Sequence, residues 1–353
     1  MNEPSFEPRE EDASPAPIHG QEVEFLKGAG PARPAGPGER AERDRRSWRR
    51  AAVLFLITVV SVFYVPTQWL VPPSPGAPLD FLRGWVFAVP LLFILLCHEF
   101  GHYIMARRHG VDVSPPYFLP FPSIIGTMGA FISIRSQIYN RRALLDIGAA
   151  GPIAGFLPAV ILLFVGYGLS GIGTPPVPSE GETVQYLVFG ENAVTLLARS
   201  LVFGELPPGH DIVIHPVGFA AWVGLLVTML NLLPLGMLDG GHISYAALGK
   251  RQWKAAPWLL AAVAAMGVLI HYWWLMVLVF FGVVLLVGGL AARWVYKVKI
   301  PFSALYRGRV LKHPPVPNEE PLDPVRRGVA LLCLVIFLLC FLPVPIEIVT
   351  VTG

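Results

Sequence analysis

The stretch GWVFAVPLLFILLCHEFGHYIMA, residues 84–106, is apolar along most of its length but carries two histidines and a glutamate near its end. It is long enough to span a bilayer, which takes roughly 20 mostly apolar residues. Imidazole and carboxylate groups are costly in hydrocarbon, so ionisable residues inside such a segment are candidates for function. The stretch therefore predicts a transmembrane helix that carries a functional site.

The spacing of these polar residues indicates a metal site. His98 and His102 are four residues apart, so on a helix both lie on one face and can direct a ring nitrogen at one metal ion. Glu99 then lies about 100° round the axis. This H-E-x-x-H pattern is typical of zinc hydrolases, although it also occurs by chance in unrelated soluble proteins. A catalytic zinc usually has three protein ligands, so we expect a third ligand elsewhere in the chain.

The composition predicts a membrane protein. Of 353 residues, 54% are hydrophobic and only 14% are charged, and the mean hydropathy is +0.57, well above what a soluble domain needs to fill its core. The formal net charge of +3 is too small to indicate a nucleic-acid partner, and we expect none. The cysteines Cys97, Cys333 and Cys340 are too few for a disulfide scaffold, and we interpret them as packing residues.

Apolar segments divide the chain. We predict an all-α polytopic membrane protein with about seven transmembrane helices, at residues 51–70, 84–106, 147–169, 213–235, 256–271, 273–294 and 328–346. The segment 1–46 is rich in Pro, Gly, Glu and Arg without an apolar run, which predicts a disordered tail. The predicted organisation is a cytoplasmic tail at 1–46, a first span with its external loop at 47–83, a central core at 84–250 and C-terminal spans at 251–353.

Basic residues predict the orientation. Clusters of arginine and lysine flank the predicted spans, and all fall on one side if the N-terminus is cytoplasmic, as the positive-inside rule requires. The opposite loops, 71–83 and 170–212, hold only Arg83 and Arg199 as bases. The clustered residues are Arg45, Arg46, Arg49, Arg50, Arg107, Arg108, Arg141, Arg142, Lys250, Arg251, Lys254, Arg293, Lys297, Lys299, Arg307, Arg309 and Lys312.

The segment 114–137 is apolar but too interrupted by proline and glycine to span the membrane as a helix. Its second part carries β-branched and aromatic residues after a glycine pair, which predicts a short hairpin or strand that enters the membrane from the cytoplasmic side. Non-helical backbone at that depth must be covered by protein or line a water-filled cavity. Residues 126–134 could offer a strand edge to an extended peptide, so we predict substrate-binding roles for Gly126, Thr127 and Gly129.

Asp239 is the predicted third ligand. It follows the fourth predicted span, in the segment NLLPLGMLDGG at 231–241. The orientation derived from the basic residues brings it to the same membrane face and depth as His98 and His102. Pro234 and the glycines unwind this segment, which lets the carboxylate turn inward.

These four residues predict hydrolysis. One Zn²⁺ per chain, held by His98, His102 and Asp239, would acidify water. Glu99 would take a proton from that water and pass it to the departing amine, which describes peptide-bond hydrolysis. Because the site lies within the membrane, the expected substrates are transmembrane segments of other membrane proteins, cut near the cytoplasmic face.

The motifs also resemble a known family. HEFGH at 98–102, paired with Asn231-x-x-Pro234-x-x-x-x-Asp239-Gly240, is similar to the site-2 protease family of intramembrane zinc metalloproteases. Further motifs resemble the branch that includes the chloroplast EGY proteases and their bacterial relatives, without a PDZ-like insert. The resemblance covers roughly residues 84–250 and implies an intramembrane metalloprotease core. It implies that Asn231 holds substrate or stabilises the oxyanion. The further motifs are PYFxP at 116–120, GTxGA at 126–130, AGPxAG at 150–155 and His215-Pro216.

Two other functions remain as alternatives. A metal transporter or metal sensor could use the same ligands, although transport favours several ligand sites along a path. An inactive relative that acts as a membrane chaperone is disfavoured because the expected catalytic residues are all present. His242 is a rival ligand, more simply explained as an interfacial side chain. We expect a multi-pass protein of a bacterial cytoplasmic membrane, and homo-oligomerisation stays open.

Overall fold

The computed structural model describes residues 37–70, 80–121, 123–269 and 316–353. The chain divides into two units, Met1–Arg46 and Ser47–Gly353. The described part of the first unit, residues 37–46, is helical, whereas the sequence predicted a disordered tail there. Its charged residues favour this helix because Arg46 and Glu42, four residues apart, form an ion pair along it. Residues 1–36 lie outside the described part.

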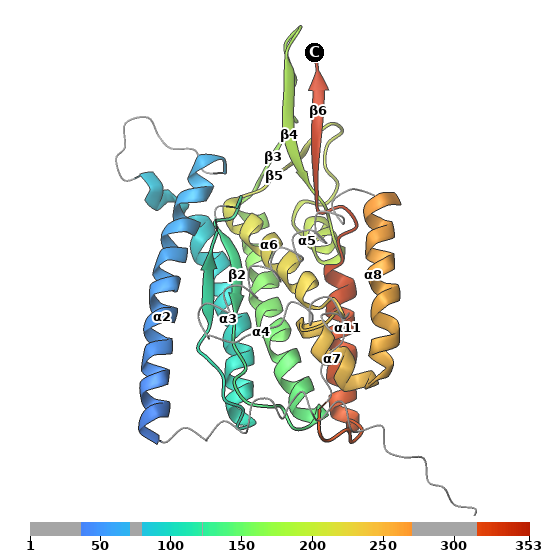
Figure 1. Ribbon diagram of the computed structural model, residues 1–353. Coiled ribbons are helices and arrows are strands. Elements are labelled where there is room, and N and C mark those ends of the chain that lie inside the picture. The colour runs from blue at the N-terminus through green and yellow to red at the C-terminus, as the bar shows by residue number, and fades with distance from the viewer. Residues whose placement is uncertain (1–36, 71–79, 122, 270–315) are drawn as a thin grey trace, which may run out of the picture. The chain divides into compact units, whose positions relative to one another are not determined.

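The second unit is mostly helical (Figure 1). Three helices, α3, α4 and α6, form its centre and pack against one another, and α7 packs against α4. The core between them is built from large apolar side chains such as Phe87, Leu144 and Phe219. The helices in the described part of the chain are α2 (Pro37–Tyr64), α3 (Trp85–Arg108), α4 (Arg141–Gly168), α5 (Ala193–Phe203), α6 (Pro216–Asn231), α7 (Asp239–Leu248), α8 (Arg251–Leu269) and α11 (Pro324–Cys340), with the 3₁₀ turns η1 (Val65–Gln68) and η2 (Asp80–Gly84).

Among the described residues, three helical segments are long and apolar enough to cross a membrane: Gly38–Gln68, Leu82–Arg108 and Arg141–Gly168. They contain the second predicted span and nearly all of the first and the third. The fourth and seventh correspond to the shorter helices α6 and α11, of 16 and 17 residues, and the fifth to α8. The sixth, 273–294, lies outside the described residues. The count of seven is therefore not confirmed.

The broken segment forms a hairpin: the strand predicted in its second part is present, and it pairs with a strand from the proline-rich first part that was not predicted. Strand β1 (Tyr117–Pro120) pairs antiparallel with β2 (Thr127–Phe131), with Tyr117 opposite Phe131. The turn depends on Gly126, whose φ of 79° lies in the region that favours glycine. Its Cα also lies so close to α2 that an added Cβ would be 2.7 Å from the Ser61 carbonyl oxygen. The hairpin thus packs on α2, and β2 also contacts α3.

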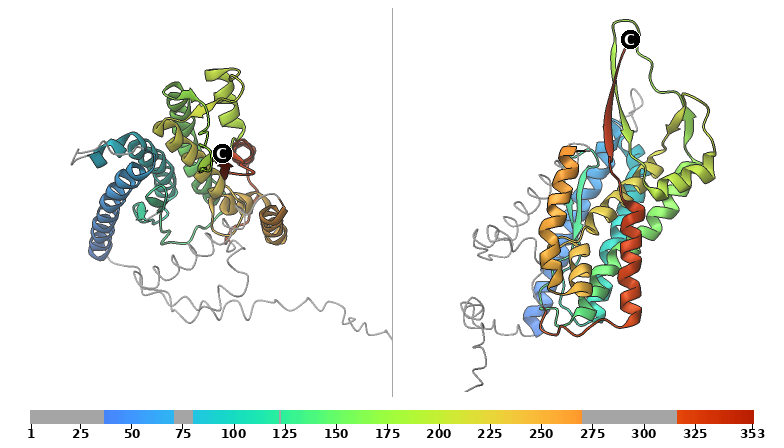
Figure 2. Two further views of the ribbon diagram at one scale, coloured as in Figure 1. Left: turned by 90° about the horizontal axis from the view of Figure 1, so that it is seen from above. Right: turned by 90° about the vertical axis from the view of Figure 1, so that its right-hand side faces the viewer.

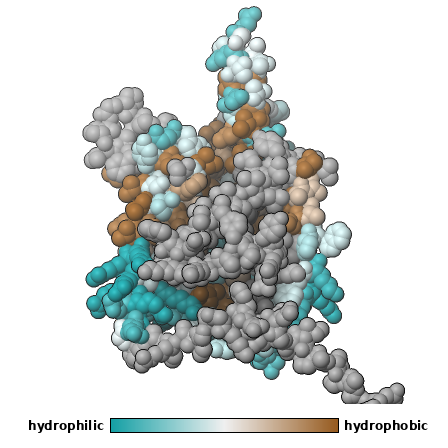
Figure 3. All heavy atoms as spheres, viewed as in Figure 1, coloured by the Kyte–Doolittle hydropathy of each residue, from teal (hydrophilic) through white to brown (hydrophobic). Residues whose placement is uncertain are grey.

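Two more strand pairs were not predicted. The first joins β3 (Gly171–Gly173) to β5 (Asp211–Val213). The second is a ribbon in which β4 (Thr183–Phe189) pairs antiparallel with the C-terminal strand β6 (Ile346–Thr352). This ribbon projects beyond the helices, as Figure 1 and the right-hand view of Figure 2 show. Hydrophobic residues gather toward its base and the tip is more hydrophilic (Figure 3).

Charged residues gather at the opposite end of the second unit. The start of α4, the residue before α8 and the start of α11 are joined there by ion pairs, so these ends lie together. This agrees with the common side predicted from the basic clusters. The pairs are Arg142 with Glu320, Lys250 with Glu319, and Arg326 with Asp146.

Candidate metal centre

Helix α3 brings the two histidines together. His98 and His102 are one turn apart on it, and both are buried. Their ring centroids are 4.9 Å apart and their Nε2 atoms 3.2 Å apart. Two imidazole nitrogens at this distance can face one ion, as the spacing predicted.

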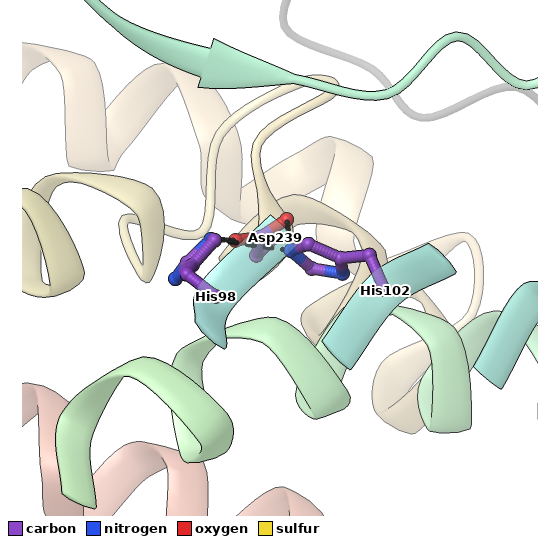
Figure 4. Close-up of side chains that lie close together, drawn as sticks. All are labelled: His98, His102 and Asp239. Carbon is purple, nitrogen blue, oxygen red and sulfur yellow. Dashed lines mark hydrogen bonds and ion pairs between the residues drawn. The ribbon is translucent and has the colours of Figure 1, made fainter. Parts of the chain in front are cut away.

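Asp239 comes from the other side of the centre. Helix α6 ends at Asn231, the chain turns, and α7 begins at Asp239. Its Oδ2 lies 3.1 Å from His98 Nε2 and its Oδ1 lies 3.2 Å from His102 Nε2. Figure 4 shows the carboxylate between the two rings. The helix N-terminus also favours a negative charge at this position.

Helix α4 orients the ring of His102. The Nδ1 atom of His102 lies 2.7 Å from the carbonyl oxygen of Ile147, so Nδ1 carries the proton and donates it. The Nε2 atom is then left with its lone pair toward Asp239. Such a bond from the second ring nitrogen to a carbonyl is the usual support of a metal-ligating histidine.

Glycines of α4 make room for both rings. A Cβ added at Gly151 would overlap the His102 ring, and one at Gly155 would lie 3.0 Å from the His98 Cβ and 3.2 Å from its Nδ1. Only glycine lets this helix back the two ligands so closely. The AGPxAG segment therefore shapes the site, a role that the sequence analysis did not assign.

The donor set fits a zinc ion. His98, His102 and Asp239 each offer one ligand atom, these atoms lie within 4.8 Å of one another, and the group could hold a metal ion. Two imidazole nitrogens and one carboxylate oxygen are typical zinc ligands, and three protein ligands leave one position open. Within the described ranges no other group of this kind is found.

Two more predicted residues lie at the centre. The Asn231 Nδ2 atom is 3.2 Å from His98 Nε2, so the last side chain of α6 reaches the ligand group. Glu99 is buried beside His98 on α3.

The hairpin residues lie outside the ligand group. Thr127 is buried, and its hydroxyl donates to the Leu119 carbonyl oxygen at 2.9 Å and accepts from the Gly129 N–H at 3.1 Å. Gly126 forms the turn, and Gly129, with a φ of 97°, lies within β2. The structure gives these residues a role in shaping the hairpin.

Other histidines are not part of this ligand group. His242 is buried on α7 against Gly148, where an added Cβ would meet the His242 Cβ at 2.9 Å. His215 precedes α6, and its Nδ1 accepts from the Val217 N–H at 3.3 Å. His271 lies outside the described residues.

The comparisons with known proteins agree with this geometry. Residues 86–257 match the model of Peptidase family M50. The chain is 35% identical over 209 residues to "Probable zinc metalloprotease EGY2, chloroplastic" of Oryza sativa subsp. indica, a match that covers 58% of this chain and 37% of the relative. The Arabidopsis thaliana protein of the same name is 32% identical over 242 residues, 66% of this chain and 42% of the relative.

A third relative, "Probable zinc metalloprotease EGY1, chloroplastic" of Arabidopsis thaliana, is 32% identical over 220 residues, 57% of this chain and 40% of the relative. The chain thus spans less than half the length of these curated relatives. No solved structure matches it. The matched segment contains His98, Glu99, His102 and Asp239, and the resemblance seen in the motifs is confirmed: residues 86–257 are similar to Peptidase family M50, and the relatives carry the name of probable zinc metalloproteases.

Proposed function

We propose that this chain is a zinc metalloprotease that hydrolyses peptide bonds within transmembrane segments of other membrane proteins. The observation that carries the proposal is the convergence of His98, His102 and Asp239 from two helices, with Glu99 beside them. A zinc ion bound there supplies Lewis acidity, which polarises a peptide carbonyl and acidifies water. The printed names of the relatives support the same activity.

The groups around the metal centre have different roles in the proposed reaction. The Glu99 carboxylate takes a proton from the attacking water and returns it to the departing amine nitrogen. The Asn231 amide, at the end of α6, is placed to donate a hydrogen bond to the developing oxyanion. The Ile147 carbonyl holds the His102 ring in one tautomer throughout.

The substrate has to reach the centre as an extended chain, because a helix hides its carbonyl groups. We propose that β2, which contacts α3, presents an edge to such a chain by β-augmentation. Gly126, Thr127 and Gly129 then act by setting the course of this strand.

We further propose that cleavage takes place near the cytoplasmic face, with the N-terminus on that side. The support is the gathering of basic residues at one end of the second unit. A multi-pass protein of a bacterial cytoplasmic membrane remains our proposal, although the named relatives are chloroplastic. The core at 84–250, the flanking spans at 47–83 and 251–353, and the seven-span count belong to the same proposal.

The test separates proteolysis from metal transport. Purified full chain is reconstituted into liposomes with a panel of single-span transmembrane peptides, and peptide cleavage and zinc flux are both measured. We expect the peptides to be cleaved, cleavage to stop when zinc is chelated, and cleavage to return when zinc is added. We expect no flux of zinc across the liposome membrane. Flux of zinc with no cleavage of any peptide would establish the transporter instead.

A further inference from the structure

Helix α7 sets the position of the third ligand. Asp239 is its first residue and Leu248 its last. The helix has 10 residues, about 15 Å of length, and helices this short are marginal without tertiary support. The contacts that hold the two ends of α7 therefore decide where the Asp239 carboxylate lies.

One arginine holds the far end of α7. The Arg141 Nε atom donates to the Ala246 carbonyl oxygen at 2.7 Å, and Nη2 donates to the Ala247 carbonyl oxygen at 2.9 Å. Its Nη1 donates to the Glu319 carbonyl oxygen at 3.2 Å. The last carbonyls of a helix lack partners within the helix, and a cation is favoured there. The guanidinium thus caps α7.

The position of Arg141 in its own helix strengthens this reading. It is the first residue of α4, where a positive charge is disfavoured by the helix dipole. The favourable interaction of its guanidinium is instead with the carbonyl groups at the C-terminus of α7. Arg142, the next residue, is half exposed and forms an ion pair with the exposed Glu320, with Nη2 3.6 Å from Oε2.

Helix α4 is also the support of every ligand. It contacts His102 through Ile147 and Gly151, and His98 through Gly155. At Gly148 it approaches α7, where an added Cβ would lie 3.5 Å from the Asp239 carbonyl oxygen. Asp239 is the ligand that does not come from α3, and α4 holds its helix at both ends.

We propose that Arg141 is a positioning residue of the metal centre: by capping α7 from the start of α4, it holds Asp239 at the distance that three-ligand binding requires. This rests on the metal centre of the proposed function. Arg141 touches neither metal nor substrate, and its effect on the metal centre passes through α7.

Zinc affinity provides the test. The dissociation constant is measured by chelator competition on the purified full chain in detergent. We expect Arg141→Gln to weaken zinc binding about tenfold, as loss of an outer partner does. Arg141→Lys keeps the charge but cannot span three carbonyls, so it should fall between wild type and Arg141→Gln. The matched control Arg142→Gln should stay within about twofold of wild type, because an exposed pair contributes little.

A second comparison separates positioning from general stability. In an Asp239→Ala background the two histidines keep a weaker affinity, and adding Arg141→Gln should change that affinity no further. If Arg141 only stabilised the fold, its substitution would weaken binding in both backgrounds. Arg141→Lys keeps the test decisive if Arg141→Gln does not fold, since unchanged affinity in Arg141→Lys would overturn the proposal.

The outcomes distinguish this proposal from the proposed function. Wild-type zinc affinity in Arg141→Gln, together with peptide cleavage by the wild type, would overturn the positioning role alone. A wild-type chain that binds no zinc would overturn both. The positioning role is supported if Arg141→Gln weakens zinc binding about tenfold in the wild-type background and has no effect on zinc binding in the Asp239→Ala background.

Discussion

The Nδ1 atom of His102 lies 2.7 Å from the carbonyl oxygen of Ile147, which places a backbone group of α4 directly behind a ligand on α3. The two residues are held at this distance because glycines of α4, including Gly151, leave room for the histidine rings. The ligand geometry thus depends on the spacing of two helices as well as on the ligands themselves.

Gly151→Ala should disable the metal centre. The added Cβ would overlap the His102 ring, so the ring must turn or α4 must move away. We expect zinc affinity to fall by at least about tenfold, the lower range for loss of outer support, with cleavage falling as well. Chelator competition measures the affinity. Gly168→Ala, on the same helix with open space around it, should bind zinc as wild type does, and normal binding by Gly151→Ala would contradict the geometry.

Asp239→Asn should remove the third ligand and the stabilisation that zinc gives. At free zinc 100 times the dissociation constant, a bound ion raises the free energy of unfolding by about 2.7 kcal/mol. Thermal melts with and without zinc should therefore separate for the wild type and nearly coincide for the variant. Asp211→Asn changes an exposed aspartate on β5 and should keep the zinc-dependent shift. An equal shift in Asp239→Asn would exclude this aspartate as a ligand.

Asn231→Ala should slow cleavage but keep the metal. If the amide donates to the oxyanion, its loss should lower kcat by about 10²-fold to 10³-fold, whereas the three ligands remain. Zinc content and single-turnover cleavage are measured on the same preparation. Loss of zinc with the rate per bound zinc unchanged would mean that Asn231 only supports His98, 3.2 Å away.

Gly126→Ala should impair substrate binding selectively. Gly126 has a φ of 79°, and an added Cβ would lie 2.7 Å from the Ser61 carbonyl oxygen, so the hairpin must shift. We expect a higher KM for transmembrane peptides with zinc affinity unchanged. Gly181→Ala is the matched control, because Gly181 has the same φ with open space around it. An equal KM in the two variants would contradict a role of the hairpin in substrate binding.

Much of the site could be predicted from the sequence because its ligands follow simple rules. Helical spacing pairs His98 with His102, and the orientation set by the basic residues brings Asp239 to the same depth. The contributions of Ile147 and Arg141 could not be predicted in this way. A backbone carbonyl has no sequence signature, and an arginine at a predicted membrane boundary is explained by the positive-inside rule alone.

The glycines of α4 did carry a signal. Gly148, Gly151 and Gly155 recur at three- and four-residue intervals, a pattern typical of close helix packing in membranes. The sequence gives a weaker signal for the ribbon of β4 and β6. Its two strands are far apart in the chain, and two strands by themselves are only marginally stable. The helical course of residues 37–46 arises from helix-favouring charged residues that composition alone assigned to a disordered tail.

The most direct measurement compares the wild type with Glu99→Gln on the panel of transmembrane peptides, with zinc content determined on the same samples. If Glu99 is the base, cleavage should fall by at least about 10²-fold, while zinc stays near that of the wild type. Glu205→Gln, at an exposed position, should cleave normally. Undiminished cleavage in Glu99→Gln, or zinc transport unaffected by the substitution in a chain that cleaves no peptide, would contradict the account.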